Sequence, residues 1–152
     1  MKISFLFAIL LFIFLCGVVI LWLVLKRSDI REVRDIEIGS HVLRVEVART
    51  LFSRARGLSY RKTLHNESGM LFVFNTPNTY SFWMRGMNFP LDFIWIRNGR
   101  IIDITENVRP ESFFFPRRVY SPKEPADMVL EVNAGRVREL GIGIEDTVQF
   151  KR

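Results

Sequence analysis

The hydrophobic and polar positions of this chain change from one pattern to another near residue 26. From Ile3 to Leu25 no side chain is charged, and a helix of that length rises roughly 34 Å, enough to cross a hydrocarbon core of about 30 Å. The run ends directly at Lys26 and Arg27 and is longer than the apolar core of a cleavable signal peptide, which is about 7 to 15 residues. The pattern therefore predicts a retained single-pass membrane anchor over residues 1–25, in contact with the lipid bilayer through residues 3–25.

Beyond a charged connector over residues 26–35, apolar side chains alternate with polar ones, which is typical of half-buried strands. The pair Asn98-Gly99 suits a type I′ hairpin turn because both residues tolerate positive φ. The run Asn75 to Asn78 interrupts the pattern and predicts a turn. Strands are predicted over residues 36–38, 43–47, 69–74, 79–84, 89–97, 100–106, 127–132 and 146–151.

Two short helices are predicted between these strands. Thr50 can cap the first, in which Leu51, Ala55 and Leu58 share one face and Gly57 lies near the end. Asn133 can cap the second, over Ala134 to Leu140. The expected fold of residues 36–152 is a single mainly β domain, a compact antiparallel sandwich or partly closed barrel with two short helices.

Composition narrows the function classes. The only cysteine, Cys16, lies in the apolar run, so the β domain can form no disulfide and no thiolate metal site. His41 and His65 stand alone, and no phosphate-binding glycine loop occurs, so no metal and no cofactor are predicted. The net charge is +6, but the lysines and arginines are scattered and no recognition motif accompanies them, so nucleic acid is not an expected partner.

Several short motifs occur in an order and spacing that resemble one known family, the domain of unknown function 192, also called uncharacterised protein family 0127. The resemblance covers about residues 40 to 150 and implies a small β-rich domain, often placed behind a signal or anchor. The motifs are Arg54-Ala55-Arg56-Gly57-Leu58, Gly69-Met70-Leu71-Phe72-Val73-Phe74, Ser81-Phe82-Trp83-Met84, Pro90-Leu91-Asp92, Glu131-Val132-Asn133-Ala134-Gly135 and Leu140-Gly141-Ile142.

Two arguments about the side of the membrane oppose each other. Four basic residues follow the apolar run within residues 26–34, whereas only Lys2 and the amino terminus precede it, and this count favours a cytoplasmic domain. The family resemblance implies an extracytoplasmic domain at the cell envelope. We give the resemblance the greater weight, because charge asymmetry around so short an N-terminal tail is a soft determinant.

Asp92 is the first candidate for chemistry, because strand alternation places it on the same face as Ile94 and Ile96. A carboxyl group on an apolar face needs a partner or a raised pKa. In the structural interpretation, which we favour, Asp92 accepts backbone N–H groups and locks the loop over residues 85–89. In the catalytic interpretation, Asp92 faces Glu106 or Glu131 in a glycosidase-type pair of acids.

A second group of candidates surrounds Trp83. Since Trp83 points opposite to Phe82 and Met84 in a strand, it lies either in a core, as large aromatics more often do, or at a shallow pocket. Such a pocket would suit a sugar ring or an apolar peptide side chain, with Arg56 and Arg85 holding an anionic group.

A third group lies in a proline-flanked loop, where Phe113, Phe114 and Phe115 precede Arg117 and Arg118. Aromatic and basic residues together suit a membrane interface with anionic lipid headgroups. The alternative is a loop folded back so that two rings close the core.

Two functions are compatible with these features. The first is a membrane-tethered, non-catalytic module that binds a ligand or an envelope protein around Trp83, Arg85, Asp92 and Arg56. The second is a small envelope hydrolase that uses Asp92 with Glu106 or Glu131. A pocket holding two facing carboxyl groups would favour the second, and a single carboxyl group bonded to backbone donors the first.

Overall fold

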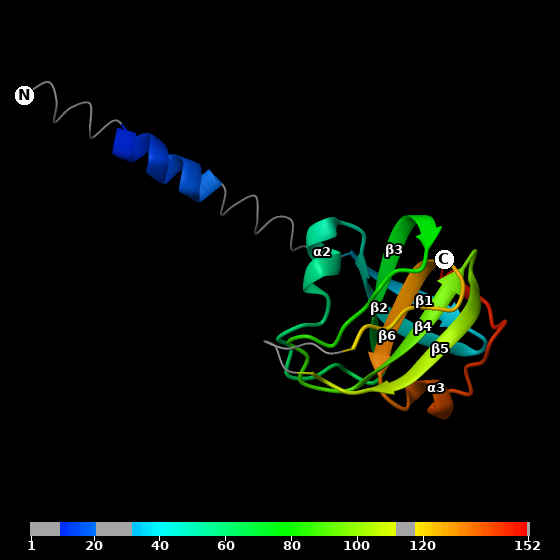
Figure 1. Ribbon diagram of the computed structural model, residues 1–152. Helices are drawn as coiled ribbons and strands as arrows, with labels where there is room; N and C mark the ends of the chain where they lie inside the picture. Colours follow the sequence, from blue (N-terminus) through cyan, green and yellow to red (C-terminus); the bar gives the residue numbers. More distant parts are fainter. Residues whose placement is uncertain (1–9, 21–31, 112–117, 152) are drawn as a thin grey trace, which may run out of the picture. The chain divides into compact units, whose positions relative to one another are not determined.

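The computed structural model describes residues 10–20, 32–111 and 118–151 (Figure 1). The chain divides into two units, Met1–Arg31 and Glu32–Arg152. In the first unit residues 10–20 are helical. Within the described residues, no helix has the length and apolarity that crossing a membrane requires. The remainder of the predicted anchor lies outside the described residues, so the anchor stays a prediction without structural support.

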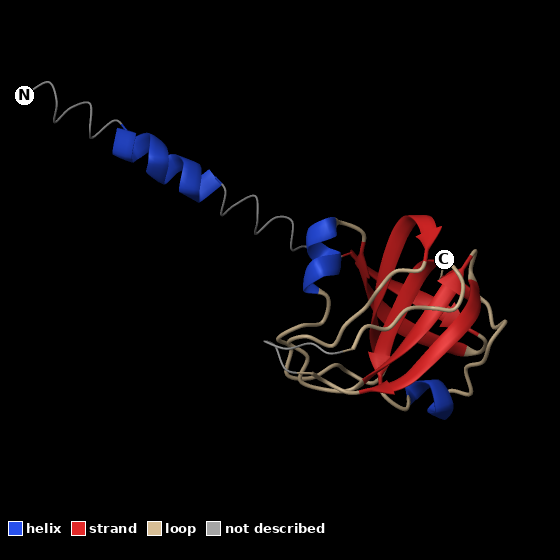
Figure 2. Ribbon diagram, in the orientation of Figure 1, coloured by secondary structure: helices blue, strands red, loops and turns tan. Residues whose placement is uncertain are grey.

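The second unit is built on strands, and its described part contains one seven-stranded sheet (Figure 2). The strand order is β5-β4-β6-β3-β2-β1-β7, with β2 and β3 parallel and all other neighbours antiparallel. The mainly β prediction is confirmed. The elements are β1 (Glu32–Ile38), β2 (His41–Ala48), α2 (Leu51–Arg56), β3 (Ser68–Asn78), β4 (Leu91–Arg97), β5 (Arg100–Val108), β6 (Ala126–Asn133), α3 (Arg136–Glu139) and β7 (Val148–Phe150).

The two outer strands of the sheet meet at one end. The backbone N–H of Val148 donates to the carbonyl of Gly99 at 2.8 Å, and that of Ile101 donates to Asp146 at 3.0 Å. These bonds join the two edge strands, β5 and β7, so the sheet is curled into a barrel. The barrel is only partly closed, because the bonds involve only a few residues. Of the two predicted architectures, the barrel describes the fold, and the sandwich of two sheets is wrong.

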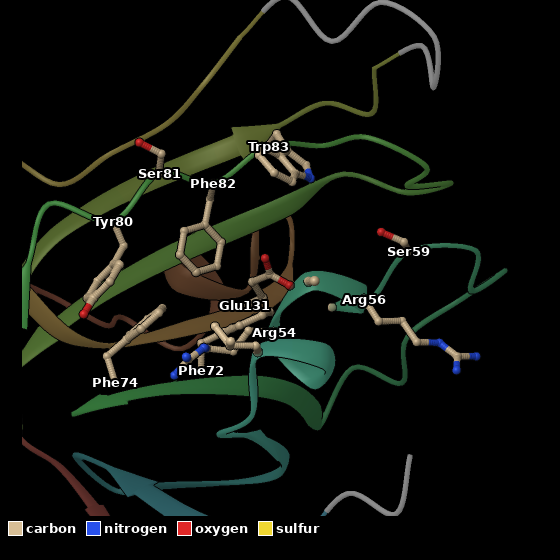
Figure 3. Close-up of a pocket in the computed structure, with 13 residues that line it drawn as sticks. Arg54, Arg56, Ser59, Phe72, Phe74, Tyr80, Ser81, Phe82, Trp83 and Glu131 are labelled. Carbon is tan, nitrogen blue, oxygen red and sulfur yellow. The ribbon is translucent and has the colours of Figure 1, made fainter. Parts of the chain in front are cut away.

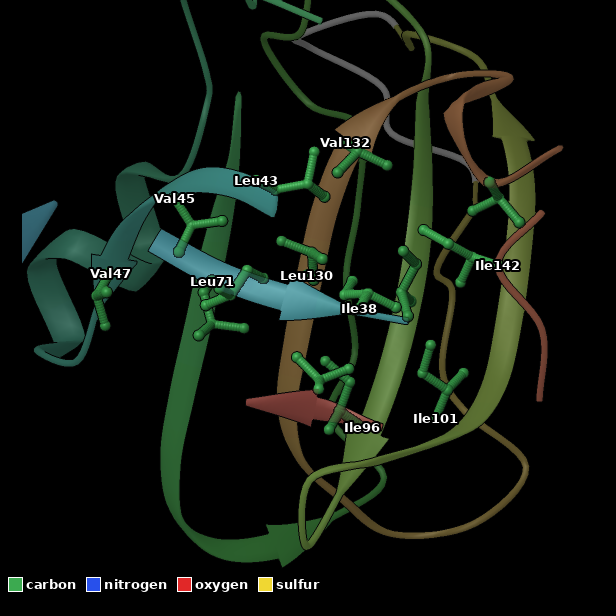
Figure 4. Packing of buried hydrophobic residues seen from close by; sticks show 14 residues of the cluster. Ile38, Leu43, Val45, Val47, Leu71, Ile96, Ile101, Leu130, Val132 and Ile142 are labelled. Atoms are coloured by element: carbon green, nitrogen blue, oxygen red, sulfur yellow. The ribbon is translucent and has the colours of Figure 1, made fainter. Parts of the chain in front are cut away.

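A first hydrophobic cluster fills the inside of this curved sheet (Figure 4). All seven strands contribute to it, as do Val137 of α3 and Ile142 after it. The strand period of two accounts for the choice of side chains, since β4 turns Ile94 and Ile96 inward. The buried members are Ile36, Ile38, Leu43, Val45, Val47, Leu71, Ile94, Ile96, Ile101, Leu130, Val132, Val137, Ile142 and Val148.

A second cluster lies on the opposite face of β3, β4 and β6, where loops cover the sheet. Leu91, Phe93 and Trp95 of β4 pack there, and Met84 and Met87 from the loop before β4 cover them. Six of the seven residues of β4 are buried as a result. A polar side chain on β4 or β6 must therefore find its partners inside the protein, on whichever face it points to.

Several local predictions are confirmed, and others need correction. Asn98 and Gly99 both have positive φ, as the type I′ turn requires. However, β3 continues without a break through residues 75–78, and residues 79–84 form no strand but a single bridge between Phe82 and Tyr120. Strand β1 begins at Glu32, so the last four residues assigned to the connector belong to the sheet.

The two helices also differ in detail from their predictions. Thr50 caps α2, and a reciprocal bond with Ser53 completes a capping box, but the predicted apolar face is wrong because Leu51 is 81% exposed. Gly135, and not Asn133, is the N-cap of α3. The Asn133 side chain donates instead to the carbonyl of Leu64 at 2.8 Å.

The close approach of β3 and β6 depends on Gly69. A Cβ atom there would lie 2.8 Å from the carbonyl oxygen of Glu131 and 3.0 Å from Leu130 Cδ1. Replacing Gly69 by alanine is expected to lower the free energy of unfolding by about 1–3 kcal/mol, because strand backbone must move apart. Thermal unfolding of the full chain measures this. Gly143→Ala is the control, since its Cβ would meet nothing closer than 3.9 Å, and an equal loss in both variants would contradict the argument.

Candidate functional site

A cavity of about 270 Å³ opens between α2, the end of β3 and the loop over residues 79–83 (Figure 3). Its walls are mainly aromatic, and among its described lining residues Glu131 of β6 is the one acid. We call this cavity the Glu131 pocket. The side chains that carry the argument are Arg54, Phe72, Phe74, Phe82, Trp83 and Glu131.

Helix α2 forms one wall and holds Arg54 in place. The capping box at Thr50 begins the helix, and Gly57 ends it with a positive φ. One guanidinium nitrogen of Arg54 donates to the carbonyl of Val73 at 2.9 Å, and the group lies 4.8 Å from the ring centroid of Phe74. The charge of Arg54 is thus directed at β3 and at an aromatic face.

The aromatic wall is built from rings that pack against one another. Phe82 meets Phe72 edge to face with ring centroids 4.9 Å apart, and it meets Trp95 of the second cluster at 5.5 Å. Phe74 and Tyr80 are stacked, with centroids 3.6 Å apart. Mutual packing of this kind keeps the walls in place without a ligand.

Trp83 follows Phe82 and points the other way. Paired backbone bonds of 2.8 Å between Phe82 and Tyr120 hold this segment extended. Trp83 is therefore 52% exposed and lines the pocket, which corrects the expectation of a core tryptophan and agrees with the pocket alternative.

Glu131 lies between two fully buried apolar residues of the neighbouring strands. Met70 of β3 and Phe93 of β4 are its register partners. Only 5% of Glu131 is exposed, and among the described residues none forms a hydrogen bond or an ion pair with its carboxyl group. Burial raises the pKa of Glu131 to about 8, because an ionised carboxylate would lose its hydration. The group is mostly protonated at neutral pH and then offers both a donor and an acceptor.

Asp92 lies on the opposite face of the sheet. Its Oδ1 accepts the backbone N–H of Asn107 at 2.8 Å, and its Oδ2 accepts those of Gly135 at 2.9 Å and Val137 at 3.2 Å. The side chain therefore joins the end of β5 to the start of α3 and serves as the acceptor for that helix. Asp92 therefore has the structural role that was favoured from the sequence. However, it holds the end of β5 and the start of α3, and not the loop over residues 85–89.

The structure does not bring together the predicted pair of acids. In the register of β4 and β6, Asp92 lies opposite Val132, whereas Glu131 lies opposite Phe93, so the two carboxyl groups point to different faces. Glu106 is exposed, and its Oε2 lies 2.7 Å from Nε of Arg138. The glycosidase-type alternative therefore lacks its pair of facing carboxyl groups among these three acids, because each has separate surroundings.

The other predicted residues lie in different places. Arg56 lines the pocket, but Figure 3 shows its side chain extending away from the cavity. Arg85 is exposed and is not among the lining residues, and its carbonyl accepts Ser59 Oγ at 3.1 Å. Arg118 is exposed and donates its backbone N–H to Glu111 at 3.2 Å. The rest of the predicted membrane-interface group, Phe113, Phe114, Phe115 and Arg117, lies outside the described residues.

Sequence reasoning missed several pocket residues that a regular pattern could have revealed. Phe72 and Phe74, like Tyr80 and Phe82, are two positions apart, which places each pair on one face of an extended segment. Glu131 was a candidate from the sequence, but as a partner of Asp92 and not as a residue of this pocket. Within the described residues, no group of three or more His, Cys, Asp or Glu side chains is arranged to hold a metal ion.

Comparisons with known proteins agree with the fold. A model of the family described as Uncharacterized ACR, domain of unknown function 192, matches residues 34–150. A crystal structure of a proposed transcription regulator from Sinorhizobium meliloti is 32% identical, with a TM-score of 0.73 and coverage of 79% of this chain and 95% of that one. A protein of unknown function from Novosphingobium aromaticivorans is 34% identical, with a TM-score of 0.70 and coverage of 77% and 84%. No curated protein matches the chain at a significant level.

Proposed function

The chain belongs to the domain of unknown function 192 family, as its motifs predicted, and we propose that its β domain is a non-catalytic module that binds a small ligand in the Glu131 pocket. The observation that carries this proposal is a cavity with aromatic walls and one buried carboxyl group that has no partner among the residues the structure describes. Small-molecule sites combine apolar walls with a few placed polar groups in this way. The cavity volume of about 270 Å³ suits a ligand of one ring.

Among the residues that the structure describes, no second acid lines the pocket beside Glu131, and this favours binding over hydrolysis. Glycoside hydrolysis of the usual kind needs two carboxyl groups about 5 to 9 Å apart, one of which gives a proton while the other acts on the sugar or on water. Asp92 points to the other face of the sheet, and its oxygens already accept three backbone N–H groups. Glu106 lies beside Arg138. The described part of the pocket lining contains no other acid.

The proposal includes a membrane tether. The support is the uncharged run from Ile3 to Leu25, which is long enough to span a bilayer, followed within seven residues by the first strand at Glu32. The domain would face the extracytoplasmic side of the envelope, and the loop with Phe113, Phe114 and Phe115 would meet anionic lipid headgroups through Arg117 and Arg118.

Alkaline carbonate extraction tests the tether on the full chain. A transmembrane helix is expected to keep the protein in the vesicle fraction, because its apolar side chains cannot leave the lipid. If the β domain faces outward, protease added to intact cells should digest the Gly69→Ala variant, because destabilisation raises the population of the open form that protease cleaves. Release of the full-length protein by carbonate would contradict the tether. Protection of the Gly69→Ala domain in intact cells, with digestion after the cells are lysed, would contradict the assigned side.

Binding in the Glu131 pocket can be tested by filling it. Ala55 lines the cavity on α2 and is exposed, so Ala55→Trp should occupy the space without disturbing the core. In saturation-transfer NMR of the full chain in detergent micelles, single-ring aromatic compounds and monosaccharides provide the probes. We expect binders of the wild type to lose at least about tenfold in affinity, since the indole takes their volume.

Phe52→Trp is the matched control for this experiment. It adds the same indole to the same helix at an exposed position that does not line the pocket, and it also reports any partition of probes into micelles. We expect this variant to bind as the wild type does. Equal binding by Ala55→Trp and Phe52→Trp, or no binding of any probe to the wild type, would overturn the proposed function.

A further inference from the structure

We infer that the end of the ligand that reaches Glu131 is an uncharged amide whose N–H and C=O groups lie on the same side, as in a primary amide or a ring amide. The inference rests on the proposed function, because it assumes that the Glu131 pocket holds a ligand. It adds the chemical class that the deep end of the pocket would select.

The carboxyl group of Glu131 has no hydrogen-bond partner among the described residues. A buried polar group without a partner costs about 1–3 kcal/mol, and such groups are rare in folded proteins unless water or a ligand completes them. Glu131 is 5% exposed and lines the cavity, and no described residue pairs with its carboxyl group, so water or a ligand in the cavity must complete its hydrogen bonds. Its register partners on the two neighbouring strands are Met70 and Phe93, and no described residue is bonded to its carboxyl oxygens. The open side of the carboxyl group is the cavity.

The neutral carboxyl group of Glu131 recognises one particular arrangement of donor and acceptor. A protonated carboxyl group has one O–H donor beside one C=O acceptor, and the two point in the same direction. A primary or ring amide offers the complementary acceptor and donor with the same spacing, so both bonds form at once. An ordinary peptide amide cannot do so, because its N–H and C=O point in opposite directions.

The walls of the pocket disfavour a charged ligand end. An anionic end would lose its hydration between mainly aromatic walls, and a cationic end would do so beside the guanidinium group of Arg54. Arg54 is turned toward Val73 and Phe74. Arg56 extends away from the cavity, and Tyr80 is the remaining lining residue that can titrate. Burial also favours the neutral form of Glu131, whose pKa is raised to about 8. An uncharged end group avoids both penalties.

The aromatic walls of the pocket select the body of the ligand. Phe72 and Phe82 meet edge to face beside Glu131, and the stacked pair of Phe74 and Tyr80 continues the wall. Flat aromatic surfaces favour a planar ring, which can stack on one wall and present its edge to another. Trp83, half exposed, lies where it can cover the outer end of such a ring.

Four probes of nearly equal shape test the inference: benzamide, benzamidinium, benzoate and toluene. Their affinities for the full chain in detergent micelles are compared at about pH 6 and about pH 9.5, on either side of the raised pKa of Glu131. At the lower pH we expect benzamide to bind at least about tenfold more tightly than each of the others. At the higher pH we expect this preference to disappear and benzamidinium to gain, because an ionised Glu131 attracts a cation and cannot donate.

Glu131→Gln provides the conservative variant. Its side-chain amide still pairs with benzamide but does not titrate, so its preference should be the same at both pH values. Binding of all probes should remain sensitive to Ala55→Trp and insensitive to Phe52→Trp. Suppose that the probes bind and that Ala55→Trp, but not Phe52→Trp, weakens their binding. The inference is then wrong, while the proposed function stands, if benzoate or benzamidinium is preferred at the lower pH or if Glu131→Gln keeps the pH dependence of the wild type. If no probe binds to the wild type, the proposed function falls, and the inference falls with it.

Discussion

Asp92→Ala is expected to lower the free energy of unfolding by about 4 kcal/mol, which corresponds to a fall in Tm of about 15 °C for a domain of this size. Asp92 is fully buried and accepts the backbone N–H groups of Asn107, Gly135 and Val137. Alanine would leave all three donors without an acceptor inside the protein, and each such loss costs about 1–3 kcal/mol. Thermal unfolding of the full chain, followed by circular dichroism, measures the change.

Two further variants make this result specific. Asp92→Asn keeps one carbonyl acceptor but turns an NH₂ group toward a backbone donor, so its loss should be about half as large. Glu106→Gln alters an exposed carboxyl group paired with the exposed Arg138, and its effect should stay below about 1 kcal/mol. If Asp92→Ala were no less stable than Glu106→Gln, the role of Asp92 as a structural acceptor would be refuted. Unchanged or increased stability of Asp92→Asn would instead favour a catalytic acid.

Glu131→Gln is expected to stabilise the protein, by an amount that grows as the pH rises from about 4.5 to about 8. The folded state keeps the proton of Glu131 up to about pH 8, whereas the unfolded chain releases it near 4.5. Between these values the unfolded state binds fewer protons, so the wild type loses stability with rising pH, and above about pH 8 the loss is complete. The neutral glutamine has no such loss. We expect a difference of about 2–4 kcal/mol at pH 8 and almost none at pH 4.5.

Unfolding curves of both proteins across this pH range give the difference directly, since all other titrating groups are shared. Glu106→Gln again serves as the exposed control, with an expected effect below about 1 kcal/mol at each pH. A constant difference between wild type and Glu131→Gln from pH 4.5 to 8 would mean that the Glu131 carboxyl group is not held protonated by burial.

Much of the local structure followed from residue patterns alone. The period-two alternation identified most strands, and Asn98-Gly99 predicted its hairpin because the turn needs two residues that tolerate positive φ. The same alternation placed Asp92 on the face of Ile94 and Ile96, which is where it lies. These properties depend on the backbone and on near neighbours, so they can be derived from short stretches of sequence.

The errors came from interactions between distant segments. The run Asn75 to Asn78 has the composition of a turn, yet pairing with β6 extends β3 to its end, with a register shift between Val73 and Asn78. Trp83 was expected in a core, but the bridge between Phe82 and Tyr120 decides which of the neighbouring side chains points inward. The residues next to each segment in the sequence do not reveal that β6 pairs with β3 or that Tyr120 pairs with Phe82.

For the candidate site, the division is the same. The sequence by itself determined that Asp92 and Glu131 lie in apolar strands, where a carboxyl group must acquire partners or keep its proton. Only the tertiary structure decided between these outcomes, because the register of β4 and β6 sends Asp92 to three backbone donors and Glu131 to an aromatic cavity. Register and burial arise from packing between segments far apart along the chain, and the chemistry of each acid follows from them.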